Sequence, residues 1–192
     1  EAPERAQWIR TLVSELARIS SHLMAMGATS MDVGALTLFL WTFTEREKLY
    51  DIFELMCGAR FTTSYSRIGG VANDIDAATL QKTREWANQF PTELHMFELL
   101  VNKNRIFVDR LSGVGYIPAE KAIALGLTGP CLRGSGVPRD LRKDEPYLAY
   151  SDFDFNVICS DGGDCFHRYL VRMDEILESL KKSEERRVKK EC

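Results

Sequence analysis

The sequence predicts a mostly α-helical fold: a helical bundle with a long loop excursion rich in glycine, proline and charge, and at most a short β element. Apolar residues recur at the spacing of one helical face in residues 4–26 and again from residue 163 onward. Residues 33–44 carry no charge and are mostly apolar, which indicates a helix buried on every side. Residues 128–162 lack this periodicity, and they form the predicted excursion.

The first helix is expected over residues 4–26. Pro3 suits its opening turn, and Gly27 is typical of a residue at which a helix ends. Its apolar face comprises Ile9, Leu12, Val13, Leu16, Ile19, Leu23 and Met24.

The second helix is expected from near Ser30, a favourable N-cap, to Cys57, with Gly58 closing it. Asp32 then occupies its second or third position, where the helix dipole favours a carboxylate. The same carboxylate borders the apolar residues 33–44, and burying an unpaired charge among them is very costly. The residues alone leave two interpretations open: a helix-dipole role, or a site for an apolar, proton-accepting ligand.

The rest of the chain is expected to alternate helices with loops. Residues 60–74 form an ordered loop around Gly69 and Gly70, and residues 153–158 (FDFNVI) form a short strand. Pro91 ends or kinks a helix, because proline disfavours the helical conformation at the residue before it. The remaining expected helices span 76–89, 92–102, 118–125 and 163–180, and the charged tail after them is solvated or frayed.

A single domain is expected, because the chain shows no internal repeat and no low-complexity linker. Residues 1–127 form the helical bundle core, and residues 128–162 form a structured loop segment. Residues 163–192 supply the C-terminal helix and charged tail of the same domain.

The bulk composition excludes several classes of protein. The net charge of -3 over 192 residues favours neither nucleic acid nor an anionic membrane surface. No apolar run is long enough to span a bilayer, and the charged first residues do not form a signal peptide. Because the chain also lacks an initiator methionine, we expect it to be a portion of a longer protein.

The cysteines and histidines do not indicate a metal site. The chain has 5 cysteines, an odd number, and none of them form a C-x-x-C pair, so isolated reduced thiols are expected. The weaker alternative is that Cys159 and Cys165 approach each other across a turn. His22, His95 and His167 are scattered, with no H-x-x-x-H or E-x-x-H spacing.

Residues 133–144 gather charged residues around glycines. A solvated loop and a folded ion-pair loop that docks on a partner are equally consistent with this composition. Arg133-Gly134-Ser135-Gly136 precedes Val137-Pro138, which does not open a phosphate-binding helix in the usual way.

Taken together, several segments resemble one family, the large hydrogenase-like (49 kDa-type) subunit of respiratory complex I, NADH–quinone oxidoreductase. The resemblance covers nearly the whole chain, in the order in which the motifs occur in the middle portion of that subunit. The matching segments are Pro3–Met24, Asp32–Lys48, Gly58–Arg60 with Tyr65–Val71, Ala119–Tyr150 and Gly163–Ser179.

The resemblance implies a function and partners. It implies a core subunit of the peripheral arm, on the matrix side of the mitochondrial inner membrane or the cytoplasmic side of a bacterial plasma membrane. Ubiquinone, the substrate, would bind between this subunit and a small iron–sulfur subunit that ligates the terminal 4Fe–4S cluster. A membrane subunit forming the quinone channel and the remaining N- and C-terminal portions of the same subunit would be further partners.

The resemblance also implies roles for particular residues. Asp32 corresponds to the aspartate that partners a quinone-binding His, and this His and its companion Tyr lie upstream of the portion present. Apolar pocket positions correspond to Met24, Leu36, Phe39 and Phe43. Arg67 corresponds to the arginine of the Y-x-R-x-G-G loop near the partner's cluster, and no metal ligand is implied in this chain.

Two departures from the family pattern matter. Thr62 stands where the family commonly has a His that interacts with the cluster, and Phe166-His167-Arg168 replaces the usual x-Asp-Arg after Cys165. A chain without the quinone-binding His and Tyr is not active alone. A non-catalytic scaffold, and a subunit of a related membrane-bound hydrogenase or ferredoxin–quinone oxidoreductase, are therefore the alternatives.

Overall fold

The computed structural model describes residues 2–185, with side chains to residue 181. The elements, in chain order, are α1 (Glu4–Asp32), α2 (Leu36–Cys57), β1 (Ser66–Arg67), β2 (Gly70–Val71), α3 (Ala77–Val101), α4 (Arg105–Leu111), α5 (Ala119–Ala124), α6 (Gly129–Arg133), α7 (Leu141–Asp144), the 3-10 helix η1 (Tyr150–Asp152) and α8 (Cys165–Glu185). The predicted mostly helical fold is confirmed.

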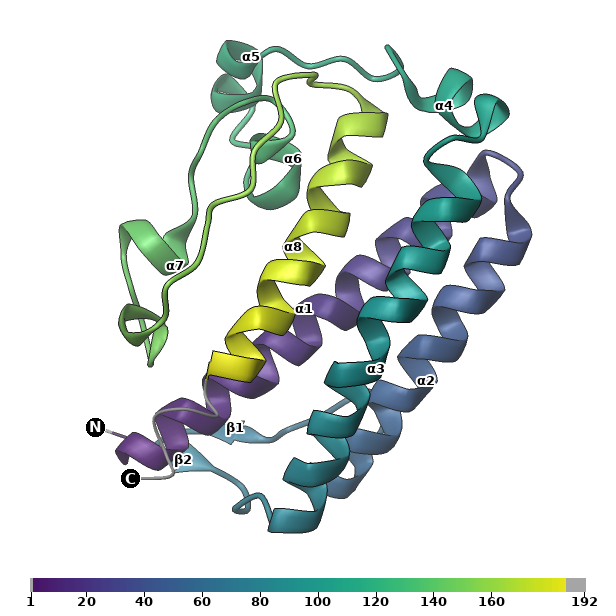
Figure 1. Ribbon diagram of the computed structural model, residues 1–192. Helices are drawn as coiled ribbons and strands as arrows, with labels where there is room; N and C mark the ends of the chain where they lie inside the picture. Colours follow the sequence, from purple (N-terminus) through teal and green to yellow (C-terminus); the bar gives the residue numbers. More distant parts are fainter. Residues whose placement is uncertain (1, 186–192) are drawn as a thin grey trace.

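Four long helices form an up-down-up-down bundle (Figure 1). Helix α1 packs against α2 and α8, and α3 packs against α2 and α8 on the other side. The bundle centre is built from side chains with almost no exposure: Leu16, Ile19, Leu23, Leu38, Leu49, Phe90, Phe97 and Ile176. Each such side chain contributes about 1.5–3 kcal/mol relative to an exposed position.

Helix α1 is longer than expected and α2 begins later. The predicted end at Gly27 is wrong, because α1 continues to Asp32, and Ser30 is an interior residue of α1 rather than the N-cap of α2. The Ser30 hydroxyl donates to the Met26 carbonyl within the same helix, at 2.7 Å.

Helix α3 is continuous through Pro91, where the sequence predicts two helices. Pro91 is exposed, whereas Phe90 and Leu94 are buried among the bundle helices. Packing of that apolar face outweighs the backbone hydrogen bond that proline removes. At the start of α3, Asp76 accepts from the Thr79 amide at 2.7 Å and acts as the N-cap.

The β structure lies elsewhere than predicted. Residues 153–158 form no strand, and the described part of the chain instead pairs β1 with β2, antiparallel, within the predicted loop 60–74. The hairpin lies beside the first turns of α1, where Arg5 Nε donates to Asp74 at 2.9 Å.

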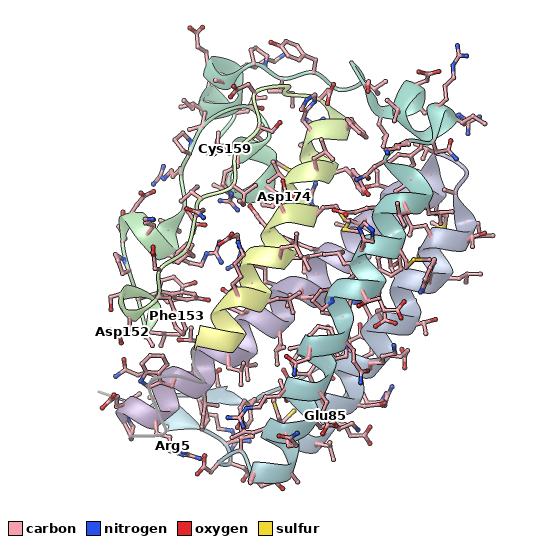
Figure 2. The ribbon with its side chains drawn as sticks, viewed as in Figure 1. Arg5, Glu85, Asp152, Phe153, Cys159 and Asp174 are labelled. Carbon is pink, nitrogen blue, oxygen red and sulfur yellow. The ribbon has the colours of Figure 1, made fainter. Side chains whose placement is uncertain are left out.

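Residues 129–164 run along the outside of α1 and α8 (Figure 1). Trp8 of α1 meets Phe153 edge-on, with ring centroids 5.3 Å apart. Figure 2 shows Asp152 and Phe153 at the end of the molecule where α1 starts. The predicted last helix is confirmed and continues past Leu180 to Glu185; the charged tail beyond it lies outside the described residues.

Candidate functional site

The α1/α2 apolar strip is an exposed face along these two helices, at the end where they are joined. Its exposed members are Met24, Met31, Leu36 and Leu40, and the half-buried rings of Phe39 and Phe43 complete it. Leu36 and Leu40, one turn apart, are 54% and 60% exposed. The expectation that residues 33–44 are buried on every side is wrong, because only Leu38 and Thr42 among them are buried. Large apolar side chains exposed together mark a surface that binds a ligand or another protein.

Gly27 allows α2 to approach α1 closely beneath this strip. A Cβ atom at Gly27 would lie 2.4 Å from Thr42 Oγ1 and 3.5 Å from Phe39 Cα. Met24 and Met31 stand three and four residues from Gly27, so they share its side of α1. Both helices therefore contribute to one apolar surface.

Asp32 is the last residue of α1, at the tight turn into α2. The Gly34 amide donates to the Met31 carbonyl at 2.9 Å, and the Ala35 amide donates to the Ser30 carbonyl at 2.7 Å. With Gly34 at φ 93°, these two bonds form a Schellman C-cap.

The helix-dipole interpretation of Asp32 is wrong, because the C-terminal end of a helix disfavours a carboxylate. Asp32 is exposed, and it forms no side-chain hydrogen bond or ion pair with the described part of the chain. Its carboxylate is therefore available to a group from outside the chain.

A buried cation that the sequence interpretation missed lies beneath the strip. Arg46 is 4% exposed and forms no ion pair with a described carboxylate; its Nε donates to Ser20 Oγ at 3.3 Å. Its guanidinium lies 4.7 Å from the Phe43 ring centroid and 5.2 Å from that of Tyr50. The Phe43 ring also contacts Phe39, at 4.5 Å between centroids. The i−3 and i+4 spacing of aromatic residues around Arg46 is the sequence pattern that indicates this arrangement.

Thr62 lies farther along the same side of α2. The ring of Phe61, its neighbour, meets Tyr50 edge-on at 6.0 Å, two turns before α2 ends. Arg60 pairs with Glu47 and Asp51, at 2.5 and 2.7 Å, so this loop folds back along α2.

Arg67 lies at the β1–β2 turn and is exposed. Arg10 of α1 donates to the carbonyl of Gly70 at 2.5 Å, which places this turn beside the second turn of α1. From Arg10 to Asp32, α1 rises about 33 Å at 1.5 Å per residue. The structure thus gathers Met24, Asp32 and the α2 apolar residues at one end, with Arg67 at the other.

Three charged residues of 133–144, Arg133, Asp140 and Arg142, are buried and form a network, whereas Arg139, Lys143 and Asp144 are exposed. Arg142 donates to Asp140 through Nε at 2.9 Å and Nη2 at 2.6 Å, and through Nη1 to Glu15 of α1 at 3.1 Å. The Tyr150 hydroxyl donates to Glu15 at 2.6 Å. Burial opposes ionisation of Asp140, but the Arg142 hydrogen bonds and charge outweigh it and lower the pKa of Asp140 to about 2.

This network continues to α8. Arg133 Nε donates to Glu175 at 2.6 Å, and Glu175 lies 2.7 Å from His22 Nε2. Burial lowers the pKa of His22, and the opposing hydrogen bond and charge of Glu175 do not offset it. Arg133 is therefore an internal ion-pair partner, and the charged segment docks on α1 and α8 of its own chain.

His167, at the second departure from the family pattern, forms a local pair. Its Nδ1 lies 2.7 Å from Asp164 Oδ1, three residues earlier, just before α8 begins. Within residues 2–185 no group of three or more His, Cys, Asp or Glu side chains is arranged to hold a metal ion. Cys159 and Cys165 are both free thiols.

The fold and the site define a helical-bundle protein with an open apolar face and an available carboxylate beside it. The family model described as "Respiratory-chain NADH dehydrogenase, 49 Kd subunit" matches residues 32–185, and the chain belongs to this family. Within the described residues, no helix is long and apolar enough to cross a membrane.

Relatives with assigned names agree with this assignment. The chain is 54% identical to an NADH-quinone oxidoreductase subunit of Chloroherpeton thalassium and 52% identical to one of Salinibacter ruber. It is 49% identical to the mitochondrial NADH-ubiquinone oxidoreductase 49 kDa subunit of Neurospora crassa. Each comparison covers 94% of this chain but only 41%, 40% and 38% of the respective relative, so the chain spans about two fifths of their length.

Proposed function

We propose that this chain contributes one wall of the quinone-reduction pocket of a proton-pumping NADH–ubiquinone oxidoreductase. Met24, Leu36, Phe39 and Phe43 of the α1/α2 apolar strip would contact the quinone. Asp32 would be the acidic half of a proton-delivery pair, whose histidine comes from polypeptide outside this chain.

The observation that carries the proposal is the juxtaposition of the exposed strip with an available carboxylate. A quinone needs apolar contacts for its ring and tail, together with a source of protons when it is reduced. The strip offers the apolar contacts. Asp32 is adjacent to the strip and has no partner among the described residues, so its carboxylate can hold a proton-donating group in place.

Asp32 would act through the histidine. A carboxylate that accepts a hydrogen bond from an imidazole raises the pKa of that histidine and fixes its tautomer. Quinone reduction would draw a proton from the histidine and leave the pair to rearrange. The turn at Gly34 holds Asp32 at the end of a rigid helix, which supports a positioning requirement of this kind.

The loop carrying Thr62 and the hairpin carrying Arg67 would face the small iron–sulfur subunit that holds the terminal 4Fe–4S cluster. These residues follow the strip along α2 toward the start of α1, so we expect an elongated contact surface, with Asp32 remote from Arg67. The membrane subunit with the quinone channel, and the portions of the relatives that this chain does not span, would complete the pocket. The assembly would sit in the peripheral arm, on the matrix or cytoplasmic side.

The test is Asp32→Asn in the assembled complex. We expect quinone reductase activity to fall, while NADH oxidation by an artificial acceptor stays intact, because only the quinone step uses Asp32. Asp152→Asn makes the same chemical change at an exposed position on the outer segment, where Figure 2 labels the residue, and should leave both activities unchanged. Unchanged quinone activity in Asp32→Asn would contradict the proposed role.

A non-catalytic scaffold of the same family is the second candidate. Mass spectrometry of the native particle separates the two candidates. A particle that contains the quinone-binding His and Tyr next to this chain supports the pocket proposal. A particle without them favours the scaffold.

A further inference from the structure

Arg110 of α4 contacts the turn that carries Asp32. Its Nη1 donates to the carbonyl of Val33, the residue after Asp32, at 2.5 Å. Arg110 and Val33 are 77 positions apart in sequence, and Figure 1 shows α4 beside the joined ends of α1 and α2. This hydrogen bond is therefore a tertiary contact made at the candidate site itself.

The contact satisfies a carbonyl that the helix leaves free. The Schellman cap uses the carbonyls of Ser30 and Met31, and Val33 lies beyond the last helical residue. At Gly34, an added Cβ would lie 3.0 Å from Arg110 Nη1, so the guanidinium packs directly on the turn. Arg110 thus fixes the backbone on the C-terminal side of Asp32.

The positive charge of Arg110 is favourable at the C-terminal end of α1. The carbonyls at a helix C-terminus concentrate partial negative charge, and Asp32 adds a full negative charge there. A cation at the same end offsets both. No described basic side chain forms an ion pair with Asp32, so its carboxylate stays available while the adjacent backbone is held.

Arg110 is itself held by a rigid support. Helix α4 begins at the N-cap Asn104, whose side chain accepts from the Ile106 and Phe107 amides at 3.0 and 3.3 Å. Phe107 is buried and meets Tyr169 of α8 edge-on, with ring centroids 5.2 Å apart. The bundle therefore fixes α4, and α4 fixes the turn through Arg110.

We infer that Arg110 is a positioning residue that acts through Asp32: it clamps the α1–α2 turn so that the Asp32 carboxylate presents a fixed geometry to the proton-delivery histidine. The inference rests on the proposed function of Asp32. It assigns Arg110 no contact with quinone.

The test is a double-mutant cycle in the assembled complex, assayed with a short-chain ubiquinone. Arg110→Gln should lower kcat for quinone reduction by about tenfold or more, since small misplacements of a reacting group cost up to about a hundredfold. KM for quinone and NADH oxidation by an artificial acceptor should not change. In the Asp32→Asn background, Arg110→Gln should lower kcat no further, because both changes remove one function.

Arg105→Gln is the matched control, because it removes the same charge from the same helix at an exposed site whose ion pair, among the described residues, is with Asp109. Arg110→Lys keeps the cation and one donor, and should retain more activity than Arg110→Gln; it carries the test if the Gln variant does not assemble. The inference would be overturned if Arg110→Gln lowered kcat in the Asp32→Asn background by the same factor as in the parent. It would also be overturned if Arg105→Gln lowered kcat as much as Arg110→Gln does. If Asp32→Asn keeps full quinone reductase activity, the proposed function is wrong. If Asp32→Asn loses this activity and Arg110→Gln keeps it, only the inference about Arg110 is wrong.

Discussion

Glu15 is the residue on which the buried charges converge. Its carboxylate accepts from Arg142 at 3.1 Å and from the Tyr150 hydroxyl at 2.6 Å, and it is 2% exposed. A carboxylate this buried is tolerated only because its donors replace water.

Glu15→Gln should therefore destabilise the chain by about 3 kcal/mol, because it leaves a buried guanidinium with one charged partner fewer. Urea unfolding followed by circular dichroism measures this change. Glu85→Gln, at an exposed position of α3 that Figure 2 labels, should stay within about 0.5 kcal/mol of the parent. Equal effects of the two substitutions would show that the network does not stabilise the fold.

His22 gives the chain a pH-dependent stability. Burial lowers its pKa below the ordinary value of 6.5, so the unfolded chain binds this proton more readily than the folded chain. The contribution is present above the unfolded pKa and is lost as pH falls through the window between 6.5 and the lower folded value.

The free energy of unfolding should accordingly fall between about pH 7.5 and about pH 5.5, and His22→Gln should weaken this dependence, because glutamine does not titrate there. Chemical denaturation at a series of pH values measures both slopes. His95→Gln, at an exposed position of α3, is the control and should leave the slope unchanged. Identical slopes in the parent and in His22→Gln would exclude His22 as the source.

Single residues are the hardest part to predict from the sequence. Apolar spacing correctly identifies Leu16, Ile19 and Leu23 as core. It offers no means of pairing Glu15 with Arg142, because these residues are 127 positions apart and ion pairs between remote segments leave no periodic pattern. For Asp32, the apolar run beside it indicates a candidate site residue, but the local sequence places it at the wrong end of a helix.

At the scale of elements, glycine has two different roles that look alike in sequence. Gly27 follows an apolar helical pattern typical of a helix end, yet it is an interior helical glycine that admits α2. Gly34, with φ 93°, performs the capping role. Which of two glycines ends a helix depends on the neighbouring helix, which local sequence does not contain. In α3, likewise, packing against neighbouring helices keeps the helix continuous through Pro91, which local sequence alone does not predict.

Gly27→Ala should separate α1 from α2. Alanine gains up to about 1 kcal/mol in helix propensity, but a Cβ 2.4 Å from Thr42 Oγ1 forces the helices apart, at a cost of about 1–3 kcal/mol. We expect a lower Tm, measured by calorimetry. Adding Thr42→Ala removes the colliding hydroxyl and should restore most of the loss. A Tm that rises in Gly27→Ala alone would contradict the close approach.

At the scale of the whole molecule, the outer segment 129–164 is attached through buried ion pairs as well as through buried apolar side chains such as Leu132, Tyr150 and Phe155. Arg133 and Arg142 join it to α8 and α1, and the aromatic contact of Phe153 with Trp8 adds an apolar attachment at one end. The four-helix bundle beneath it has its own apolar core. The two parts should therefore open independently.

Arg142→Gln should accelerate amide hydrogen exchange in residues 141–155 by about tenfold, equivalent to ~1.4 kcal/mol of local opening, and leave α2 and α3 unaffected. Exchange measured by mass spectrometry resolves these segments. Arg139→Gln is a matched control, because Arg139 is exposed and its side chain forms no hydrogen bond or ion pair with the described residues. Uniform acceleration over the whole chain would instead indicate one cooperative unit.

The short turn between α1 and α2 also affects the order in which contacts form during folding. Its three residues, 33–35, bring two long helices together at little cost in chain entropy, so this hairpin of helices can form early in folding. The Glu15–Arg142 contact must instead close a separation of 127 residues and strip water from charges that are stable while hydrated. Refolding should therefore show a fast phase reported by the helical signal of α1 and α2, and a slower phase reported by docking of the outer segment.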